Sequence, residues 1–256
     1  MEAVDPKEFL ACELSIDPFE EQTEIAANLK LTLNAAELLR KHQEEAAGDA
    51  LLMLYPSAVD AILRRRAKGD VALGELVDVA GYQIKAGEDP SPAERFIGLE
   101  HVERHTGRVV GSLGVDHLTG PKTLFAPGDV LYPRLRPYLN KAWVTQSDGL
   151  CSVDQYVLRP PGGTDAELLA HALRGRSVLL AAIGFTSSLQ LPRIRKADLL
   201  SIRVPVIPTG QQSDAKAELA QARDQVIRLF DLRQEASRLC RALHESSLNL
   251  AFSNRY

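Results

Sequence analysis

The sequence has little cysteine and no long apolar run. Its three cysteines, Cys12, Cys151 and Cys240, are widely spaced among 256 residues and form no C-x-x-C pair. This pattern disfavours a disulfide framework and a structural zinc site, and it fits a reducing compartment. The stretch 1–14 is interrupted by charged residues, and no window approaches the roughly 18 apolar residues of a transmembrane helix. We therefore expect a cytoplasmic protein that is neither exported nor anchored in a membrane.

Recognisable catalytic and nucleotide-binding patterns are also lacking. His101, His105 and His117 lie close in sequence, but their neighbours have loop composition and no Cys or Asp completes a metal shell. Surface or loop histidines are the simpler interpretation. The glycines of 111–114 and 161–164 lack the Lys and the spacing of a phosphate-binding loop. We assign no catalytic residue, no metal and no cofactor.

The remaining composition is that of an ordinary globular protein, with 45% hydrophobic and 25% charged residues. The net charge of -4 hides an asymmetry along the chain. Residues 1–62 hold 4 Lys and Arg against 13 Asp and Glu, whereas residues 128–203 hold 10 against 6. A local basic surface of this kind can attract a nucleic acid even in an acidic protein. A solvated mosaic of charges is the more frequent explanation when charge is the only evidence.

Residues 20–54 and 214–250 have the composition and the apolar spacing of long amphipathic helices. In the second segment apolar residues recur every seven positions at Ala222, Leu229, Ala236, Leu243 and Leu250, with Leu219, Val226 and Cys240 on a companion series. A repeat of this length predicts a coiled-coil partner. The two segments align at an offset of 190 residues, which matches Gln22 with Gln212, and each follows a Pro-containing connector. The identities by themselves are also explained by chance, because any two helices rich in Ala and Leu share many residues.

The segment between these helices changes to short β-type runs separated by Gly, Pro and Asp. The expected strands are 77–79, 109–110, 143–145 and 155–158, and one helix is expected over 165–180. The sequence therefore predicts an α+β fold with one central mixed α/β domain, flanked by two long helices that form an antiparallel coiled coil or helical bundle. We expect three segments, namely an N-terminal connector and helix over 1–68, the central domain over 69–208 and a C-terminal helix over 209–256.

Two loops of the central domain carry candidate binding residues. After a Pro-Gly-Asp turn and a short apolar strand, the first loop holds Arg134, Arg136, Tyr138, Asn140 and Lys141. The second holds Thr186, Ser187, Ser188, Gln190, Arg193, Arg195 and Lys196. Arginine forks match guanine edges or phosphates, asparagine matches adenine, and tyrosine can stack or bond a phosphate. One such loop by itself is better explained as an ordinary surface loop with salt bridges, but two in one domain favour a nucleic-acid surface.

Within these loops the side chains suggest two roles. The candidates for base or groove contacts are Arg134, Arg136, Asn140, Ser188, Gln190 and Arg193. The candidates for phosphate contacts are Lys141, Arg195 and Lys196.

Several short motifs follow one another in order along the chain. They are PFEEQTEI at 18–25, PGDVL at 127–131, LRPYLNK at 135–141, DGLCS at 148–152, LRP at 158–160, and LPRI at 191–194 after a helix and Gly184. Each motif is loose, but together with the repeated helix their order resembles the specificity subunits of type I restriction-modification systems. The resemblance covers nearly the whole chain.

This resemblance implies a target-recognition domain that reads one half of a split DNA sequence, and long helices that set spacing and dock methyltransferase subunits. It implies a non-catalytic chain, with S-adenosylmethionine and catalysis in partner methyltransferase or endonuclease subunits, and with double-stranded DNA and a restriction subunit as further partners. The chain departs from the family pattern because it has one such domain instead of two. It is then a half-size subunit forming a homodimer through its helices, a fragment or permuted form pairing its own two helices, or a member of a related system that reads a single short site. The main alternative is a coiled-coil interaction module whose central domain binds a protein or a glycan, and a hydrolase or nuclease ranks third.

Overall fold

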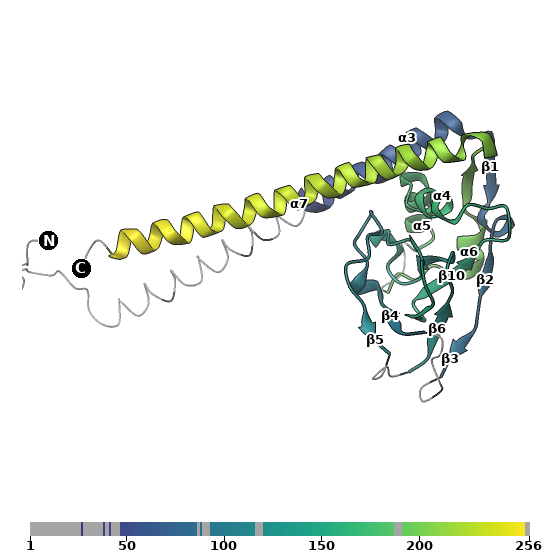
Figure 1. Cartoon of the computed structure of the whole chain (residues 1–256), viewed down its shortest axis with the longest axis horizontal. Coiled ribbons are helices and arrows are strands. Elements are labelled where there is room, and N and C mark those ends of the chain that lie inside the picture. The colour runs from purple at the N-terminus through teal and green to yellow at the C-terminus, as the bar shows by residue number, and fades with distance from the viewer. Residues whose placement is uncertain are drawn as a thin grey trace, which may run out of the picture. The chain divides into compact units, whose positions relative to one another are not determined.

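The computed structural model describes residues 27, 38, 41, 47–85, 88, 93–115, 120–186 and 191–253. The chain divides into two compact units, Met1–Ala47 and Gly48–Tyr256. Most of the predicted helix 20–54 belongs to the first unit and lies outside the described residues. The helices of the second unit are α3 (Leu54–Arg66), η1 (Leu73–Glu75), η2 (Leu99–His101), η3 (Pro137–Leu139), α4 (Ala166–Leu173), α5 (Arg176–Gly184), α6 (Lys196–Ser201) and α7 (Thr209–Ser253) (Figure 1).

The strands form three sheets, and the pairing is antiparallel except between β4 and β9. A two-stranded sheet pairs β1 (Gly69–Ala72) with β11 (Arg203–Val206). A four-stranded sheet has the order β2 (Asp78–Ala80), β10 (Gln155–Arg159), β7 (Val130–Pro133) and β8 (Trp143–Val144). A five-stranded sheet has the order β3 (Gln83–Ile84), β6 (Lys122–Phe125), β9 (Gly149–Ser152), β4 (Arg95–Ile97) and β5 (Leu113–Gly114).

The core of the second unit is layered. Strand β7 is buried along its whole length, and successive side chains point to opposite faces. On one face Leu131 joins Phe125 and Trp143 in the core between the two larger sheets. On the other face Val130 and Tyr132 pack against α4 and α5. The helices therefore cover the four-stranded sheet, and α4 lies between that sheet and α7 (Figure 1).

Helix α7 has 45 residues and is roughly 70 Å long, so it extends well past the domain that it packs on (Figure 1). The segment from Gly48 to Arg66, which contains α3, runs antiparallel to α7, because Arg66 pairs with Glu218 at 2.8 Å while Gly48 lies close to Phe230. Among the described side chains of α7, Leu219 and Val226 of the companion series are buried, and so is Ala215, which lies seven residues before Ala222 on the main series. Leu229, on the main series, is 50% exposed.

The structure confirms the predicted α+β class and corrects two details. The single helix predicted over 165–180 is wrong, because α4 ends at Leu173 and α5 begins at Arg176. The break is made from α3, where the Asp60 carboxylate accepts hydrogen bonds from the backbone nitrogen and the hydroxyl of Ser177 at 2.9 and 3.0 Å and so caps α5. The strand predicted over 109–110 is reduced to one bridge between Val102 and Val109. The structure has strands at the other three predicted positions.

Candidate nucleic-acid interface

The two predicted binding loops lie side by side. Leu135 and Arg193 form an antiparallel bridge, although 58 positions separate them in the sequence. On either side of this bridge the Arg136 nitrogen donates to the Pro192 carbonyl at 2.7 Å, and the Ile194 nitrogen donates to the Arg134 carbonyl at 3.0 Å. The structure thus joins two basic segments into one surface, which we call the paired loops.

Five cations of the paired loops are exposed, namely Arg134, Arg136, Arg193, Arg195 and Lys196. The Arg193 side chain is 47% exposed and lies 3.2 Å from Asp154, and that of Arg195 is 83% exposed and pairs with Asp198 at 2.7 Å. Exposed pairs of this kind contribute little to stability, so a phosphate can replace the carboxylate at small cost. Arg136 and Lys196 have no ion pair with any residue that the structure describes.

The short helix η3 is bounded by two residues with left-handed backbone. Arg136 has a φ of 49° and Asn140 a φ of 52°, a region that side chains other than glycine adopt rarely. The Asn140 side chain is buried and donates to the carbonyl of Arg174 at 2.8 Å, which anchors one end of the loop. A contact between Asn140 and adenine would therefore require this interior hydrogen bond to break.

Other predicted residues differ in their placement. Thr186 is buried, and its hydroxyl donates to the Ala182 carbonyl at 3.1 Å. Lys141 is half-buried and donates to the Leu99 carbonyl at 2.7 Å, and burial lowers the pKa of its ammonium group. Tyr138 is exposed and remains a candidate for stacking. Ser187, Ser188 and Gln190 lie outside the described residues.

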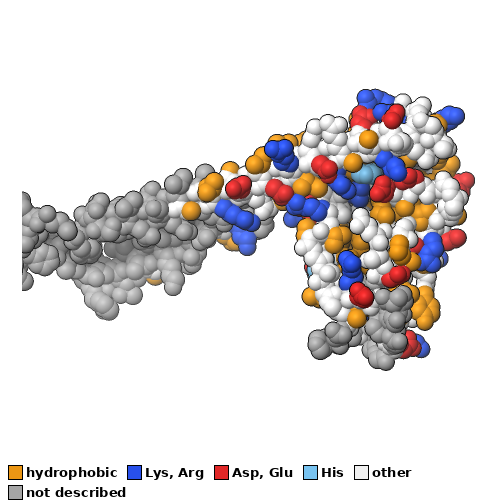
Figure 2. All heavy atoms as spheres, in the orientation of Figure 1, with side chains coloured by type: hydrophobic (Ala, Val, Ile, Leu, Met, Phe, Trp, Pro, Cys, Tyr) orange, Lys and Arg blue, Asp and Glu red, His pale blue; other side chains and the backbone are white. Residues whose placement is uncertain are grey.

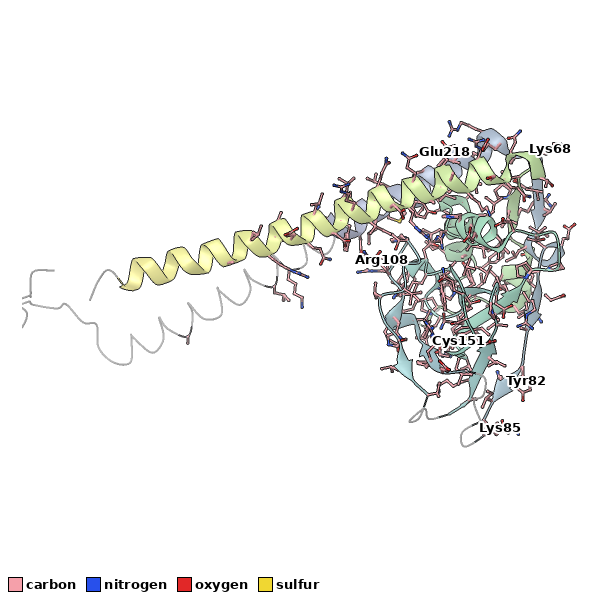
Figure 3. The ribbon with its side chains drawn as sticks, viewed as in Figure 1. Lys68, Tyr82, Lys85, Arg108, Cys151 and Glu218 are labelled. Atoms are coloured by element: carbon pink, nitrogen blue, oxygen red, sulfur yellow. The ribbon has the colours of Figure 1, made fainter. Side chains whose placement is uncertain are left out.

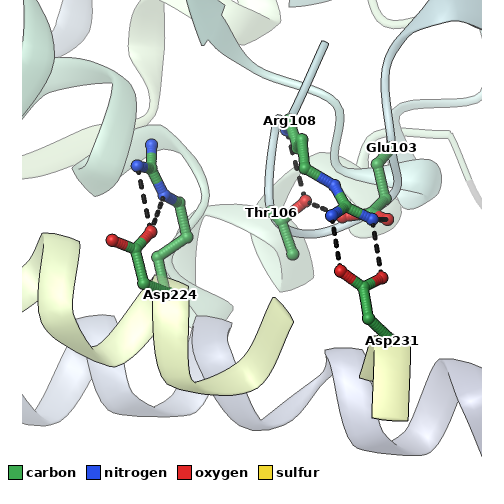
Figure 4. A network of polar contacts seen from close by, with 6 residues as sticks. Glu103, Thr106, Arg108, Asp224 and Asp231 are labelled. Atoms are coloured by element: carbon green, nitrogen blue, oxygen red, sulfur yellow. Dashed lines mark hydrogen bonds and ion pairs between the residues drawn. The ribbon is translucent and has the colours of Figure 1, made fainter. Parts of the chain in front are cut away.

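A polar network that the sequence did not reveal ties the central domain to α7. Arg108, which Figure 3 labels, donates through both terminal nitrogens to the carboxylate of Asp231, at 2.9 and 3.0 Å. It also donates to Glu103 at 2.6 Å, and Figure 4 shows these contacts from close by. The hydroxyl of Thr106 donates to Glu103 at 2.5 Å. Hydrogen bonds from Arg108 lower the pKa of the Asp231 carboxyl. The loop 103–108 is thereby held against the long helix.

We expect the pair between Arg108 and Asp231 to contribute about 0.5 to 1 kcal/mol to stability, because both side chains are partly exposed. A double-mutant cycle with Arg108→Gln and Asp231→Asn, read by urea unfolding, measures this coupling. The coupling should shrink in high salt. The neighbouring pair of Arg223 and Asp224, within α7, is the matched comparison. A coupling energy near zero between Arg108 and Asp231 would show that this bridge does not tie the domain to the helix.

Two structural findings concern other functional classes. Among the residues that the structure describes, no helix is long and apolar enough to span a membrane, and no three His, Cys, Asp or Glu side chains gather as they would around a metal ion. Cys151 is buried in β9, and burial raises the pKa of its thiol to about 12, which is unsuited to a nucleophile.

Similarity to known proteins agrees with the motif order. No family model matches the sequence. Over 142 residues, 55% of this chain, the sequence is 30% identical to the type I restriction enzyme EcoDI specificity subunit of Escherichia coli. This chain is similar to type I specificity subunits. The resemblance inferred from the motifs is thereby confirmed, and the match spans 31% of that relative.

Solved structures extend the comparison to the fold. A chain from a structure of a type I R-M system aligns with 90% of this chain and 58% of its own length, with a TM-score of 0.53 and 18% identity. This alignment shows a shared fold. The HsdS subunit of Thermoanaerobacter tengcongensis aligns over 89% of this chain and 58% of its own, with 20% identity and a TM-score of 0.46. This chain therefore spans well under two thirds of the length of each of these proteins.

Proposed function

We propose that this chain is a sequence-specific DNA recognition subunit of a type I restriction-modification complex. The observation that carries the proposal is the 30% identity over 142 residues to a type I specificity subunit. The paired loops support it independently, because five exposed cations lie on two segments that are next to each other in space. Arginine and lysine on such a surface suit the phosphates and base edges of a duplex.

In this proposal the central domain, residues 69–208, contacts the duplex through the paired loops. The flanking helices of residues 1–68 and 209–256 pair as an antiparallel coiled coil, which acts as a spacer and docks the methyltransferase subunits, with a restriction subunit as a further partner. The chain itself performs no catalysis and binds no cofactor. A twofold homodimer through the helices would supply the second half-site, since dimer symmetry matches a pair of sites.

Modified-base sequencing of the source genome, with and without this gene, tests the proposal. We expect methylation to disappear at one defined motif, and a split motif would indicate that two recognition domains act together. Methylation that persists unchanged while an active partner methyltransferase is expressed would contradict the proposal. If the purified chain shows no salt-dependent binding to a duplex, the interaction-module alternative is favoured.

Replacing Arg136 and Lys196 in turn should separate base contacts from phosphate contacts. Arg136→Ala is expected to reduce the affinity ratio between the target and a random duplex about tenfold, the loss of one base contact. Lys196→Ala should weaken binding to both duplexes equally and lower the salt slope by about one unit. Fluorescence anisotropy over a range of salt concentrations measures both quantities. Equal effects of the two changes on both duplexes would contradict these roles.

A further inference from the structure

A cleft of about 930 Å³ lies where α7 meets the central domain, and we call it the junction cleft. Its walls come from α7, from α4, from the loop around Arg108, and from β8 with the residues that follow it up to Ser147. All of these belong to the second compact unit. Figure 2 shows Lys and Arg side chains gathered with acidic ones along this junction. None of the candidate residues predicted from the sequence lines the cleft.

Cations outnumber acids in the walls of the junction cleft. The acids are Glu167, Asp224, Asp231 and Glu235, and the cations are Arg95, Arg108, Arg174, Lys216, Arg223 and Arg228. Arg108, Lys216 and Arg223 are neutralised by ion pairs with neighbouring carboxylates. The other three, Arg95, Arg174 and Arg228, have no carboxylate partner among the residues that the structure describes. The acid Glu235 likewise has no cationic partner among the described residues, so the walls hold three unpaired cations against one unpaired acid.

Arg174 is the most buried of these cations, with 3% of its surface exposed. One terminal nitrogen donates to the Ala142 carbonyl at 2.8 Å, and the other donates to His171 Nδ1 at 3.1 Å. Its guanidinium lies 5.8 Å from the ring centre of Tyr55, and its Nε has no hydrogen-bond partner. All of these partners are neutral. A buried charge without a counter-charge is costly to a folded protein, so this arrangement calls for an anion from outside the chain.

The remaining walls suit a phosphate ester better than a simple ion. Gln146 and Ser147 offer hydrogen-bond donors, and the exposed side chains of Val109 and Leu232 offer an apolar surface for a sugar. Guanidinium groups match phosphate oxygens in pairs. We propose that the junction cleft binds phosphate esters, with Arg174 as its buried cation and Arg95 and Arg228 as its exposed ones. The ligand is either a backbone phosphate of bound DNA, in which case the inference rests on the proposed function, or a free phosphate compound.

The test uses the full chain and the variants Arg95→Ala and Arg228→Ala, which remove exposed side chains and should fold. Arg176→Ala is the matched control, because Arg176 is also exposed, on α5, but lies outside the cleft. Two measurements are made on each protein. The first is the affinity for a target duplex and for a random duplex, and the second is the rise in melting temperature with inorganic phosphate against chloride at equal ionic strength.

If DNA supplies the phosphate, each cleft variant should bind both duplexes about fivefold more weakly, while Arg176→Ala changes the affinity little. Fivefold is about the largest effect expected from losing one exposed ion pair. If a free compound supplies it, phosphate should stabilise the wild type and not the cleft variants, with duplex binding unaltered. Arg174→Gln should abolish either effect provided that its circular dichroism shows a folded chain.

The inference is overturned if both cleft variants match Arg176→Ala in duplex affinity and in phosphate stabilisation. The proposed function is judged separately, by the ratio of the wild-type affinities for the target and random duplexes. If the wild type prefers the target duplex and the cleft variants behave like Arg176→Ala, the inference is wrong and the proposed function stands. If the wild type binds target and random duplexes equally, while phosphate stabilises it and not the cleft variants, the proposed function is wrong and the inference stands.

Discussion

Lowering the pH from 7 to 5 is expected to reduce the free energy of unfolding by about 4 kcal/mol, because two buried histidines must remain neutral in the folded protein. Burial lowers the pKa of His105 to about 4, with a further contribution from Arg104. Burial lowers the pKa of His171 to about 2, with further contributions from Arg174, Arg223 and Lys216. Only 6% of the surface of His105 and 5% of the surface of His171 are exposed.

The sign of this effect follows from which state binds the proton first. An unfolded histidine titrates near pH 6.5, and both folded values lie below it, so the unfolded chain takes up protons while the folded one does not. The histidine contribution is therefore intact above pH 6.5 and is lost as the pH falls toward 4 for His105 and further for His171. At pH 5 each histidine costs about 2 kcal/mol. Aspartate and glutamate titrate near pH 4 in the unfolded chain, below this window.

The contacts of His171 explain why it resists protonation. Its Nδ1 accepts hydrogen bonds from the Tyr55 hydroxyl and from Arg174, and a guanidinium can only donate. A proton on Nδ1 would break the bond from Arg174 and place two cations together in the interior. The three residues come from α3, α4 and the turn that follows α4, so acid should loosen the packing of these helices first.

His105→Asn isolates one of the two contributions. Asparagine tolerates the left-handed backbone of this position, where φ is 63°. Urea unfolding of the wild type and the variant at pH 8, 7, 6 and 5 should show that the variant loses about 2 kcal/mol less between pH 7 and 5. The pH 8 values serve as the reference for the cost of the substitution itself. Parallel curves at all four pH values would contradict the buried neutral state of His105.

Replacing Leu219 by alanine is expected to lower the free energy of unfolding by about 3 kcal/mol, the usual cost of removing a buried leucine side chain. Leu219 is fully buried between α7 and α3, where it packs with Tyr55, Val59 and Ala215. The cavity left by the change cannot close easily, because helices on both sides are held by the rest of the core.

Leu229→Ala is the matched control for Leu219→Ala. Both residues are leucines of the same helix, but Leu229 is half-exposed and its loss should cost well under 1 kcal/mol. Thermal or urea unfolding of both variants measures the difference. Similar losses in the two variants would show that α7 does not pack on α3 through the face that contains Leu219.

The comparison of these two leucines also shows what sequence reasoning can reach. The composition of residues 214–250 predicts a helix because helix propensity is local, and α7 spans that segment. The repeat contains both Leu219 and Leu229, and nothing in the sequence says which series meets a partner within the described domain. The strand at 130–133 follows a turn signal and an apolar run, so it too is locally encoded.

The errors arise where the decisive contact is distant in sequence. The break between α4 and α5 depends on Asp60, more than 100 positions earlier, and a local pattern cannot contain it. Asn140 was assigned to DNA by its chemistry, but the carbonyl of Arg174 takes up its amide inside the domain. Arg174 itself gave no signal, because an arginine in a helical segment reads as a surface residue until the fold buries it.

The two-stranded sheet of β1 and β11 bears on how such chains could diversify. Its register places Gly69 opposite Val206 and Ala72 opposite Arg203, so the points where the chain enters and leaves the central domain are neighbours. The described residues between 73 and 202 are connected to the helices through this stem, and they also pack on α3 and α7 through α4, α5 and Arg108. A different domain with the same spacing between its ends could be spliced onto the stem while α3 and α7 keep their mutual register. Such a replacement would have to reproduce the contacts that α4, α5 and Arg108 make with α3 and α7.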